Sequence, residues 1–373
     1  MAFIYSIKDT YRAAVEAATG GKNTVMYDDK GNPSIMVAIP KFKIKDVIDG
    51  GSDKVHPAFI VNGVEKDVIY IGKYQACVTD GRAYSLPGQD PQAYVNFDNA
   101  LKYCYAKGPG WHLMSNAEYA AIALWCKKNG YMPRGNNNYG SDHSASYETG
   151  KTSYLTGGKT GRVATGSGPC AWSHDGTPDG IYDLNGNVWE WTSGMRLKDG
   201  EIQIIADNNA AIHNANHGVN SELWKAILQD GSLVAPGTAD TLKWDYANSK
   251  ITLAKTLTTQ ADASRNTNFE AIGTVSSITV PEILKTLILH PNETGYESDN
   301  VWMNNSGERL PLRGGSFFYS ASAGVFALSL SYPRASSYFY IGFRAALLLL
   351  VRSCKPKGLL PVQRDVKGSI PTP

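Results

Sequence analysis

Two short motifs near the end of this 373-residue chain enclose a segment of unusual composition. The motif RGGS stands at 313–316 and the motif IGFR at 341–344. Of the 24 residues from 317 to 340, eight are aromatic and six are serine, against 10% aromatic in the whole chain, and Arg334 is the only charge. Tyr and Phe offer large contact areas at low entropic cost, and Ser adds adaptable hydrogen bonds, as in antibody paratopes. The segment therefore indicates binding rather than catalysis.

Together with DGIYDLNGNVWEW at 179–191, these motifs resemble the formylglycine-generating-enzyme (sulfatase-modifying factor) branch of the C-type lectin fold. The resemblance implies an α+β fold, here with a small N-terminal segment and a long insert. Within that branch, 317–340 is similar to the variable region of proteins diversified by a retroelement, which rewrites adenines in the asparagine codons of a template. Replacing either adenine of AAC or AAT yields Tyr, Ser, Phe and other residues, but never a stop codon.

Thirteen positions of this segment hold residues that such codon changes reach. The resemblance makes them the candidate ligand-binding positions, which we expect to be exposed on one face: Phe317, Phe318, Tyr319, Ser320, Ser322, Ser329, Ser331, Tyr332, Ser336, Ser337, Tyr338, Phe339 and Tyr340. We expect Val325, Phe326, Leu328 and Leu330 to anchor the segment. One sequence leaves open the alternative of a Tyr- and Ser-rich loop under ordinary selection.

The chain divides into five parts. Residues 1–65 form an N-terminal segment for packing or oligomerisation, residues 66–194 and 306–352 match the two halves of the lectin-type fold, residues 195–305 are an insert, and residues 353–373 read as a flexible tail. Apolar periodicity and turn residues predict helices at 7–18, 221–228 and 281–289, and strands at 34–40, 42–48, 241–246, 250–254 and 345–351. The resemblance implies an opening strand at 68–74 and helices at 94–105 and 111–126. Ser115 and Glu118 have the spacing of a capping box.

The sequence Asn-Gly-Asn-Val-Trp-Glu-Trp at 185–191 predicts a tight turn that leads into a strand. Trp189 and Trp191 would then share one face of that strand and enter the core together with Ile341 and Phe343. Glu190 would point the other way or pair with a buried arginine, for which Arg313 and Arg344 are the candidates. We expect this pair to be structural, because a role in catalysis has to be argued from a site.

The enzymes that the motifs resemble depend on paired cysteines just after the Gly-Gly-Ser strand. In this chain the equivalent positions fall near Tyr319 and Gly324, and no cysteine occurs between 171 and 353. The thiolate that the chemistry requires is therefore missing. We predict that the chain is not an enzyme.

Metals and cofactors are not expected either. His213 and His217 are four residues apart, but no third ligand or adjacent acid accompanies them, which favours surface histidines over a metal site. An oxygen-rich run spans 175–187, yet turn chemistry explains its Asp and Asn residues as well as calcium does, and the sugar-binding tripeptides of lectins are not evident.

Net charge, cysteine content and apolar segments limit the partners and the cellular compartment that we expect. A net charge of +2 without a basic stripe argues against nucleic acid. Five cysteines without CxxC spacing (Cys77, Cys104, Cys126, Cys170 and Cys354) fit buried thiols made in a reducing cytoplasm. The start of the chain lacks the features of a signal peptide, and the apolar run 345–351 is too short to cross a bilayer.

We therefore predict a protein whose hypervariable face binds a protein or cell-surface receptor. The resembling proteins serve in receptor recognition, which points to a phage particle or, alternatively, to a cell surface. A homo-oligomer is compatible with this prediction. The alternative is a structural protein of the same fold whose Tyr/Phe/Ser patch lies at a subunit interface.

Overall fold

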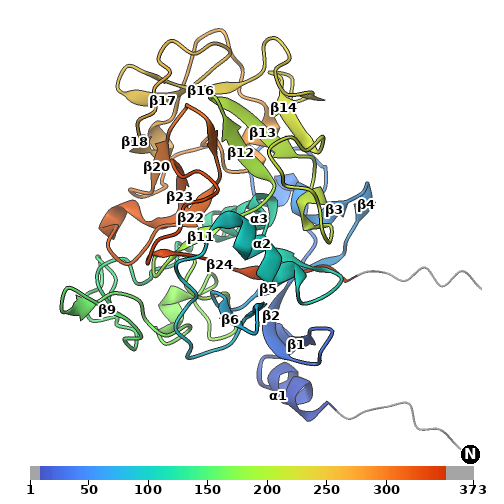
Figure 1. The fold of residues 1–373 in the computed structure, drawn as a ribbon, viewed down its shortest axis with the longest axis vertical. Coiled ribbons are helices and arrows are strands. Elements are labelled where there is room, and N and C mark those ends of the chain that lie inside the picture. Colours follow the sequence, from blue (N-terminus) through green and yellow to red (C-terminus); the bar gives the residue numbers. More distant parts are fainter. Residues whose placement is uncertain (1–8, 350–373) are drawn as a thin grey trace, which may run out of the picture.

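A computed structural model describes residues 9–349 of the chain, in which sheets predominate (Figure 1). A five-stranded sheet has the order β1 (Asn23–Tyr27), β2 (Pro33–Pro40), β5 (Val68–Gly72), β25 (Ala345–Leu347) and β8 (Trp111–Leu113). The N-terminal strands thus complete a sheet with strands from both halves of the lectin-type region. Helix α1 (Thr10–Ala18) packs on β1, where Arg12 Nε donates to the Val25 carbonyl at 2.8 Å. The tail that we predicted at 353–373 lies outside the described residues.

A six-stranded sheet brings the three motifs together. Its order is β18 (Arg265–Asn268), β20 (Asn300–Met303), β23 (Gly324–Leu330), β22 (Leu312–Gly314), β11 (Trp189–Trp191) and β24 (Ile341–Phe343). Glu190 is opposite Arg313 on one side and Gly342 on the other. The strand of the WEW motif therefore lies between the RGGS and IGFR strands.

The third sheet is built mainly from the insert, at the top of Figure 1. Its main path is β15 (Leu233–Val234), β14 (Trp224–Ile227), β13 (Glu201–Ile205), β16 (Lys243–Ala247), β17 (Lys250–Ala254) and β19 (Gly273–Thr274), while β12 (Met195–Lys198) joins β13 to β21 (Glu308–Arg309). Small hairpins complete the strands: β3 (Ile60–Val61) with β4 (Val64–Glu65), β6 (Cys77–Thr79) with β7 (Arg82–Tyr84), and β9 (Leu155–Thr156) with β10 (Lys159–Thr160).

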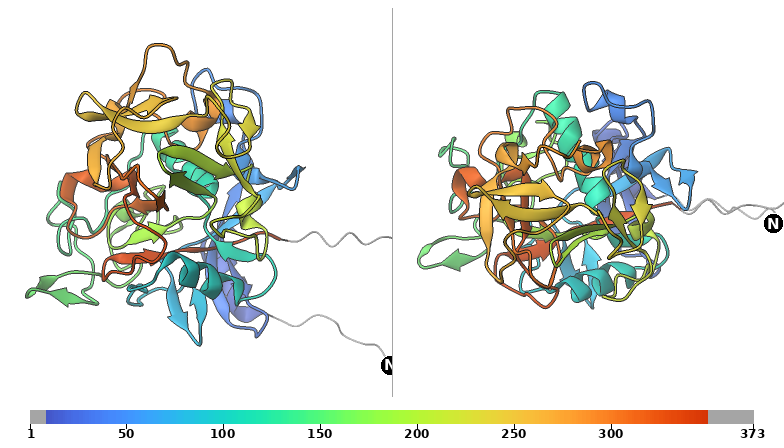
Figure 2. Two further views of the ribbon diagram at one scale, coloured as in Figure 1. Left: turned by 45° about the horizontal axis from the view of Figure 1, so that its top comes forward. Right: turned by 90° about the horizontal axis from the view of Figure 1, so that it is seen from above.

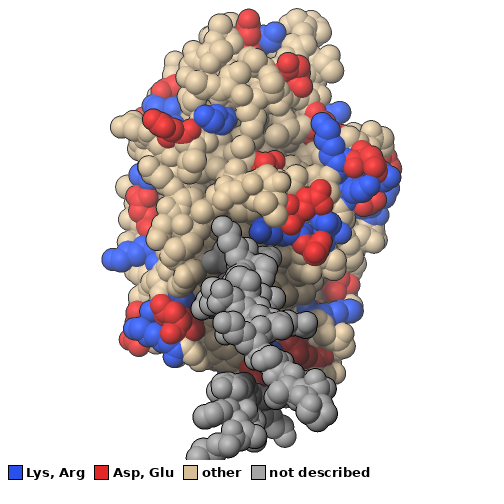
Figure 3. All heavy atoms as spheres, turned by 90° about the vertical axis from the view of Figure 1, so that its right-hand side faces the viewer, with Lys and Arg blue, Asp and Glu red and all other residues tan. Residues whose placement is uncertain are grey.

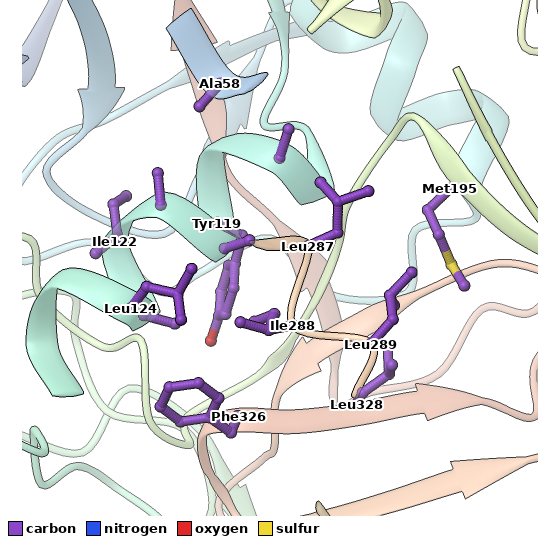
Figure 4. Packing of buried hydrophobic residues seen from close by; sticks show 14 of the residues in the cluster. Ala58, Tyr119, Ile122, Leu124, Met195, Leu287, Ile288, Leu289, Phe326 and Leu328 are labelled. Atoms are coloured by element: carbon purple, nitrogen blue, oxygen red, sulfur yellow. The ribbon is translucent and has the colours of Figure 1, made fainter. Parts of the chain in front are cut away.

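The longer helices begin where their caps predict. Helix α2 (Phe97–Tyr105) is capped by Asn96. In α3 (Asn116–Lys128) the predicted capping box is confirmed: Ser115 Oγ accepts from the Glu118 N–H at 3.1 Å, and Glu118 Oε2 accepts from the Ser115 N–H at 2.9 Å. Helix α4 (Glu282–Thr286) lies inside the predicted 281–289 helix and begins directly after Pro281. Figure 4 shows Tyr119 of α3, Ile288 after α4, and Phe326 of β23 packed in one core.

Two predicted elements are wrong. Residues 42–48 are not a strand but contain a 3-10 helix at Ile44–Asp46, because Ile44, Val47 and Ile48 have helical spacing and all become buried. Residues 221–228 are not a helix. They form strand β14, whose backbone pairs with β13 and β15, so long-range pairing overrides local helix propensity. By contrast, the predicted hairpin at 241–254 is confirmed, and its turn residues Asn248 and Ser249 have φ values of 52° and 60°.

The predicted pairing of Glu190 is with Arg344. Arg344 Nη2 and Nε donate to the two Glu190 carboxylate oxygens at 2.6 and 2.9 Å, and both side chains are almost completely buried. Arg344 also donates to the carbonyls of Gly72 and Tyr182 at 2.9 and 2.8 Å. Arg313 is buried elsewhere and bonds Asn116 Oδ1, and burial lowers its pKa to about 9. Trp189 and Trp191 are both fully buried, in the cluster that also contains Ile341 and Phe343.

Arg344→Met should destabilise the protein by about 3–5 kcal/mol, because it leaves the Glu190 carboxylate buried without a cation. Adding Glu190→Met should recover part of this loss, since no unpaired charge then remains. Urea denaturation of the single and double variants measures both effects. As a control, Lys198→Ala removes an exposed pair with Asp199 and should cost at most about 0.5 kcal/mol. An Arg344→Met cost no larger than that of the control would contradict this account.

Candidate binding face

The candidate residues lie along three pieces of chain that follow strand β22. Gly314 and Gly315, with φ values of 90° and 84°, turn the chain out of the sheet. A Cβ at Gly314 would lie 2.7 Å from the Leu184 carbonyl oxygen, so this turn requires glycine. The first piece runs from Phe317 through the 3-10 helix at Ser320–Ser322, the second is β23, and the third is the loop 331–340.

The structure places eleven of the thirteen candidates at least partly at the surface. Ser320, Ser337 and Tyr338 are exposed, and eight more are half-buried: Phe318, Tyr319, Ser322, Ser331, Tyr332, Ser336, Phe339 and Tyr340. Val325, Phe326, Leu328 and Leu330, which we expected to anchor the segment, are all buried.

The expectation of surface exposure is wrong for two candidates, because Phe317 and Ser329 are both buried. The Phe317 N–H donates to the Asn187 carbonyl at 3.2 Å, its own carbonyl accepts from the Tyr139 N–H at 2.7 Å, and its ring packs edge-on against Tyr139. Ser329 is the second-last residue of β23 and lies between Trp302 of β20 and Leu312 of β22. A residue inside a central strand cannot reach solvent when the sheet is covered on both faces.

The aromatic candidates form a continuous array. Ring centroids are 4.9 Å apart for Phe318 and Tyr319, 5.2 Å for Phe318 and Tyr340, and 5.4 Å for Tyr340 and Tyr338, whose rings are stacked. The hydroxyls of Tyr332 and Tyr340 are 3.2 Å apart. Burial raises the pKa of Tyr332 and Tyr340, so at neutral pH these hydroxyls stay protonated and can donate hydrogen bonds.

Hydrogen bonds from outside the segment hold the main chain of the loop 331–340. The donors to its carbonyls include the Arg162 guanidinium and several backbone N–H groups: Tyr94 to Tyr338 at 2.9 Å, Phe97 to Arg334 at 3.1 Å, Trp189 to Tyr340 at 2.9 Å, Leu310 to Tyr332 at 3.0 Å, and Arg162 Nη1 to Phe339 at 2.7 Å. None of these bonds uses a candidate side chain.

Arg334 provides a further clamp. Its guanidinium donates to Glu308 Oε2 at 2.9 Å, to Asp98 Oδ1 at 2.6 Å and to the His217 carbonyl at 2.9 Å. It thereby ties the loop to helix α2 and to the insert. The only charge in the segment is thus fully engaged by the scaffold.

Sequence reasoning missed several residues that shape this face. Trp302 of the insert packs edge-on against Tyr319 and Trp189, with centroids 5.2 and 5.7 Å apart. Asp299 is buried behind β23, where its Oδ2 accepts from the Phe326 N–H at 2.7 Å. Nothing in the insert's sequence marks either residue, because their positions depend on the parallel pairing of β20 with β23.

The histidines of the 213–217 loop do not share a helix face. His213 packs edge-on against Tyr105, and His217 is buried between Phe97 and Trp224. His217 is therefore not the surface histidine that we expected. Within residues 9–349, no three His, Cys, Asp or Glu side chains gather as a metal site would require. In the same part of the chain, no helix combines the length and apolar character needed to cross a membrane.

Comparison with protein families matches residues 13–221 to the sulfatase-modifying factor enzyme 1-like domain. This match confirms the predicted α+β fold of the formylglycine-generating-enzyme type. No curated protein matches the sequence significantly. Among solved structures, the variable protein 1 of Treponema denticola is 13% identical with a TM-score of 0.32, over 87% of this chain and 98% of that one. PvdO from Pseudomonas aeruginosa is 16% identical with a TM-score of 0.34, over the same shares of the two chains.

Asp299 should make stability depend on pH. Burial raises its pKa from 3.8 to about 8. Between these values the unfolded chain releases a proton that the folded protein keeps, so the free energy of unfolding should fall as the pH rises, and level off above about pH 8. The slope is at most about 1.4 kcal/mol per pH unit. Asp299→Asn should remove this contribution.

Urea denaturation of both proteins over this pH range isolates the effect, because other titrating groups cancel in the difference between them. A difference in the free energy of unfolding that stays constant with pH would mean that Asp299 is ionised in the folded protein.

Proposed function

We propose that this chain, which belongs to the sulfatase-modifying factor enzyme 1-like family, is a ligand-binding protein whose 317–340 segment is diversified by a retroelement. One observation carries the proposal: the main chain of the loop 331–340 is held by groups outside the segment, while eleven of the thirteen candidate residues lie at least partly at the surface. Side chains of the loop 331–340 can therefore change while the hydrogen bonds that fix its main-chain conformation remain. Surface substitutions also usually cost little stability.

The chemistry of the face suits a protein or cell-surface receptor. Half-buried Tyr and Phe rings with neighbouring Ser residues are typical of adaptable protein-binding surfaces, and aromatic residues dominate the energetics of such interfaces. In this proposal the protein acts on a phage particle or, alternatively, on a cell surface.

Catalysis of the kind that the family name describes is not part of the proposal. No cysteine occurs between 171 and 353. A Cβ at position 324 would overlap Asp299 Oδ1, so a cysteine there would collide with the carboxylate that caps β23. At position 319 the Tyr ring packs against Trp189 and Trp302.

A display library tests the scaffold. If the eleven surface candidates are randomised with the residues that changed AAC codons encode, most members should stay folded, because the main-chain bonds remain. The same randomisation of Val325, Phe326, Ala327, Leu328 and Leu330 should leave few folded members, since core substitutions create cavities. Protease resistance of displayed members measures folding. Equal survival of the two libraries would refute the division into fixed scaffold and variable face.

Sequencing the genomic locus tests diversification itself. We expect a reverse-transcriptase gene nearby and a second copy of the DNA for this segment that differs from it only at adenines of the copy. A locus without such a copy would favour the alternative in which the aromatic patch is a subunit contact.

A further inference from the structure

We infer that a hairpin outside the diversified segment supplies the constant wall of a subsite on the binding face, and that this subsite, as lined in this chain, takes an apolar side chain next to a carboxylate on a protein partner. The inference rests on the proposed function and adds the chemistry of the partner. Its elements are the β9–β10 hairpin, residue Tyr139, and the aromatic residues beside them.

An open pocket of about 370 Å³ lies where the hairpin meets the variable face. Its lining is Tyr139, Thr156, Gly157, Lys159, Phe317, Phe318 and Phe339. Figures 1 and 2 show the hairpin projecting on the side of the molecule that carries the orange-red C-terminal segment. Four aromatic rings thus form the walls, and the volume is at the low end for a ligand site, which suits a side chain rather than a large cofactor.

The hairpin is attached to the variable segment by fixed contacts. The Tyr139 N–H donates to the Phe317 carbonyl, and Arg162, whose guanidinium lies 4.0 Å from the Tyr154 ring centroid, donates to the Phe339 carbonyl. The two parts therefore present one continuous surface. Because 139–162 lies outside 317–340, its half of the pocket does not change when the segment is diversified.

The hairpin and the neighbouring Tyr139 also expose apolar surface. Leu155 is 62% exposed and Tyr139 is 40% exposed. A two-stranded hairpin of this size is not stable alone, so large apolar side chains at its surface are explained better by contact with a partner.

The charge of Lys159 indicates which chemical group a partner would place at this pocket. Lys159 is the only charged residue that lines the pocket, and its ammonium lies 4.9 Å from the Tyr139 ring centroid. Within residues 9–349 no carboxylate pairs with it, whereas the nearby Arg162 is paired with Asp90 at 2.7 Å and Arg334 with Glu308. The segment 317–340 contains no acidic residue. A carboxylate on the partner would thus meet an unpaired cation at the rim of an apolar pocket.

Figure 3 shows the opposite situation on another face, where Lys and Arg alternate with Asp and Glu. Ion pairs outside the variable face include Lys41–Glu65 and Lys43–Asp53. Cations with such partners offer a ligand no free charge, so the unpaired Lys159 beside aromatic rings is the better candidate.

The test is selection from a displayed library of random peptides, with the full-length protein as bait. Enriched peptides should carry an aromatic or aliphatic residue next to Asp or Glu. An enriched peptide should bind Lys159→Glu about tenfold more weakly than the unaltered protein, and this binding should weaken with added salt, because the contact is a rim ion pair. Lys159→Arg, which keeps the charge, should change its affinity by no more than about twofold.

Lys151→Glu is the matched control, because Lys151 is exposed on the same loop but does not line the pocket. Its affinity should stay within about twofold of the unaltered protein. Because Lys159 is exposed, unchanged melting temperatures should show that all three variants fold.

The double variant Tyr338→Ser/Tyr340→Ser separates the two proposals. Peptides that lose affinity for it but not for Lys159→Glu would overturn the constant subsite and leave the binding face intact. Peptides insensitive to both would overturn both proposals. Enrichment without acidic residues, no enrichment at all, or binding to arrayed neutral glycans in place of peptides would also overturn the subsite.

Discussion

The buried ion pair between Glu190 and Arg344 is the contact on which the rest of this fold depends. It joins strand β11 of the six-stranded sheet to the residue that follows β24, and through the Gly72 carbonyl it reaches the five-stranded sheet. Gln75 Nε2 donates to the same carboxylate at 3.0 Å. Each buried charge therefore has several partners, which is the condition under which such a pair is tolerated in a core.

The groups that position the 331–340 loop are different from the candidate side chains that give the binding face its chemistry. The chain between β23 and β24 is positioned by main-chain groups of Tyr94, Phe97 and Trp189 and by two arginines that are themselves ion-paired. The insert supports the same face from the other side, since β20 extends the sheet and Trp302 packs beneath Tyr319. The insert is therefore part of the platform and not a separate appendage.

Local signals predicted those elements whose cause is local. The capping box at Ser115, the turn at Asn248 and the alternation around Glu190 all depend on residues close in sequence, and all three are confirmed. Where the cause is distant, prediction failed. Strand β14 exists because β13 and β15 take its hydrogen bonds, and Ser329 is buried because β20 and β22 flank it.

The sequence by itself determined the fold class, through motifs that resemble those of a known family. It also determined the core tryptophans, the arginine partner of Glu190 and the confinement of the aromatic and serine residues between two motifs, because side-chain alternation and composition can be read along the chain. Only the tertiary structure decided which candidates reach solvent, that Asp299 accepts from the Phe326 N–H of β23, and that Lys159 lies beside Tyr139 with no carboxylate partner among the described residues. These outcomes depend on segments far apart in sequence being packed side by side, and burial and pairing arise only from that packing.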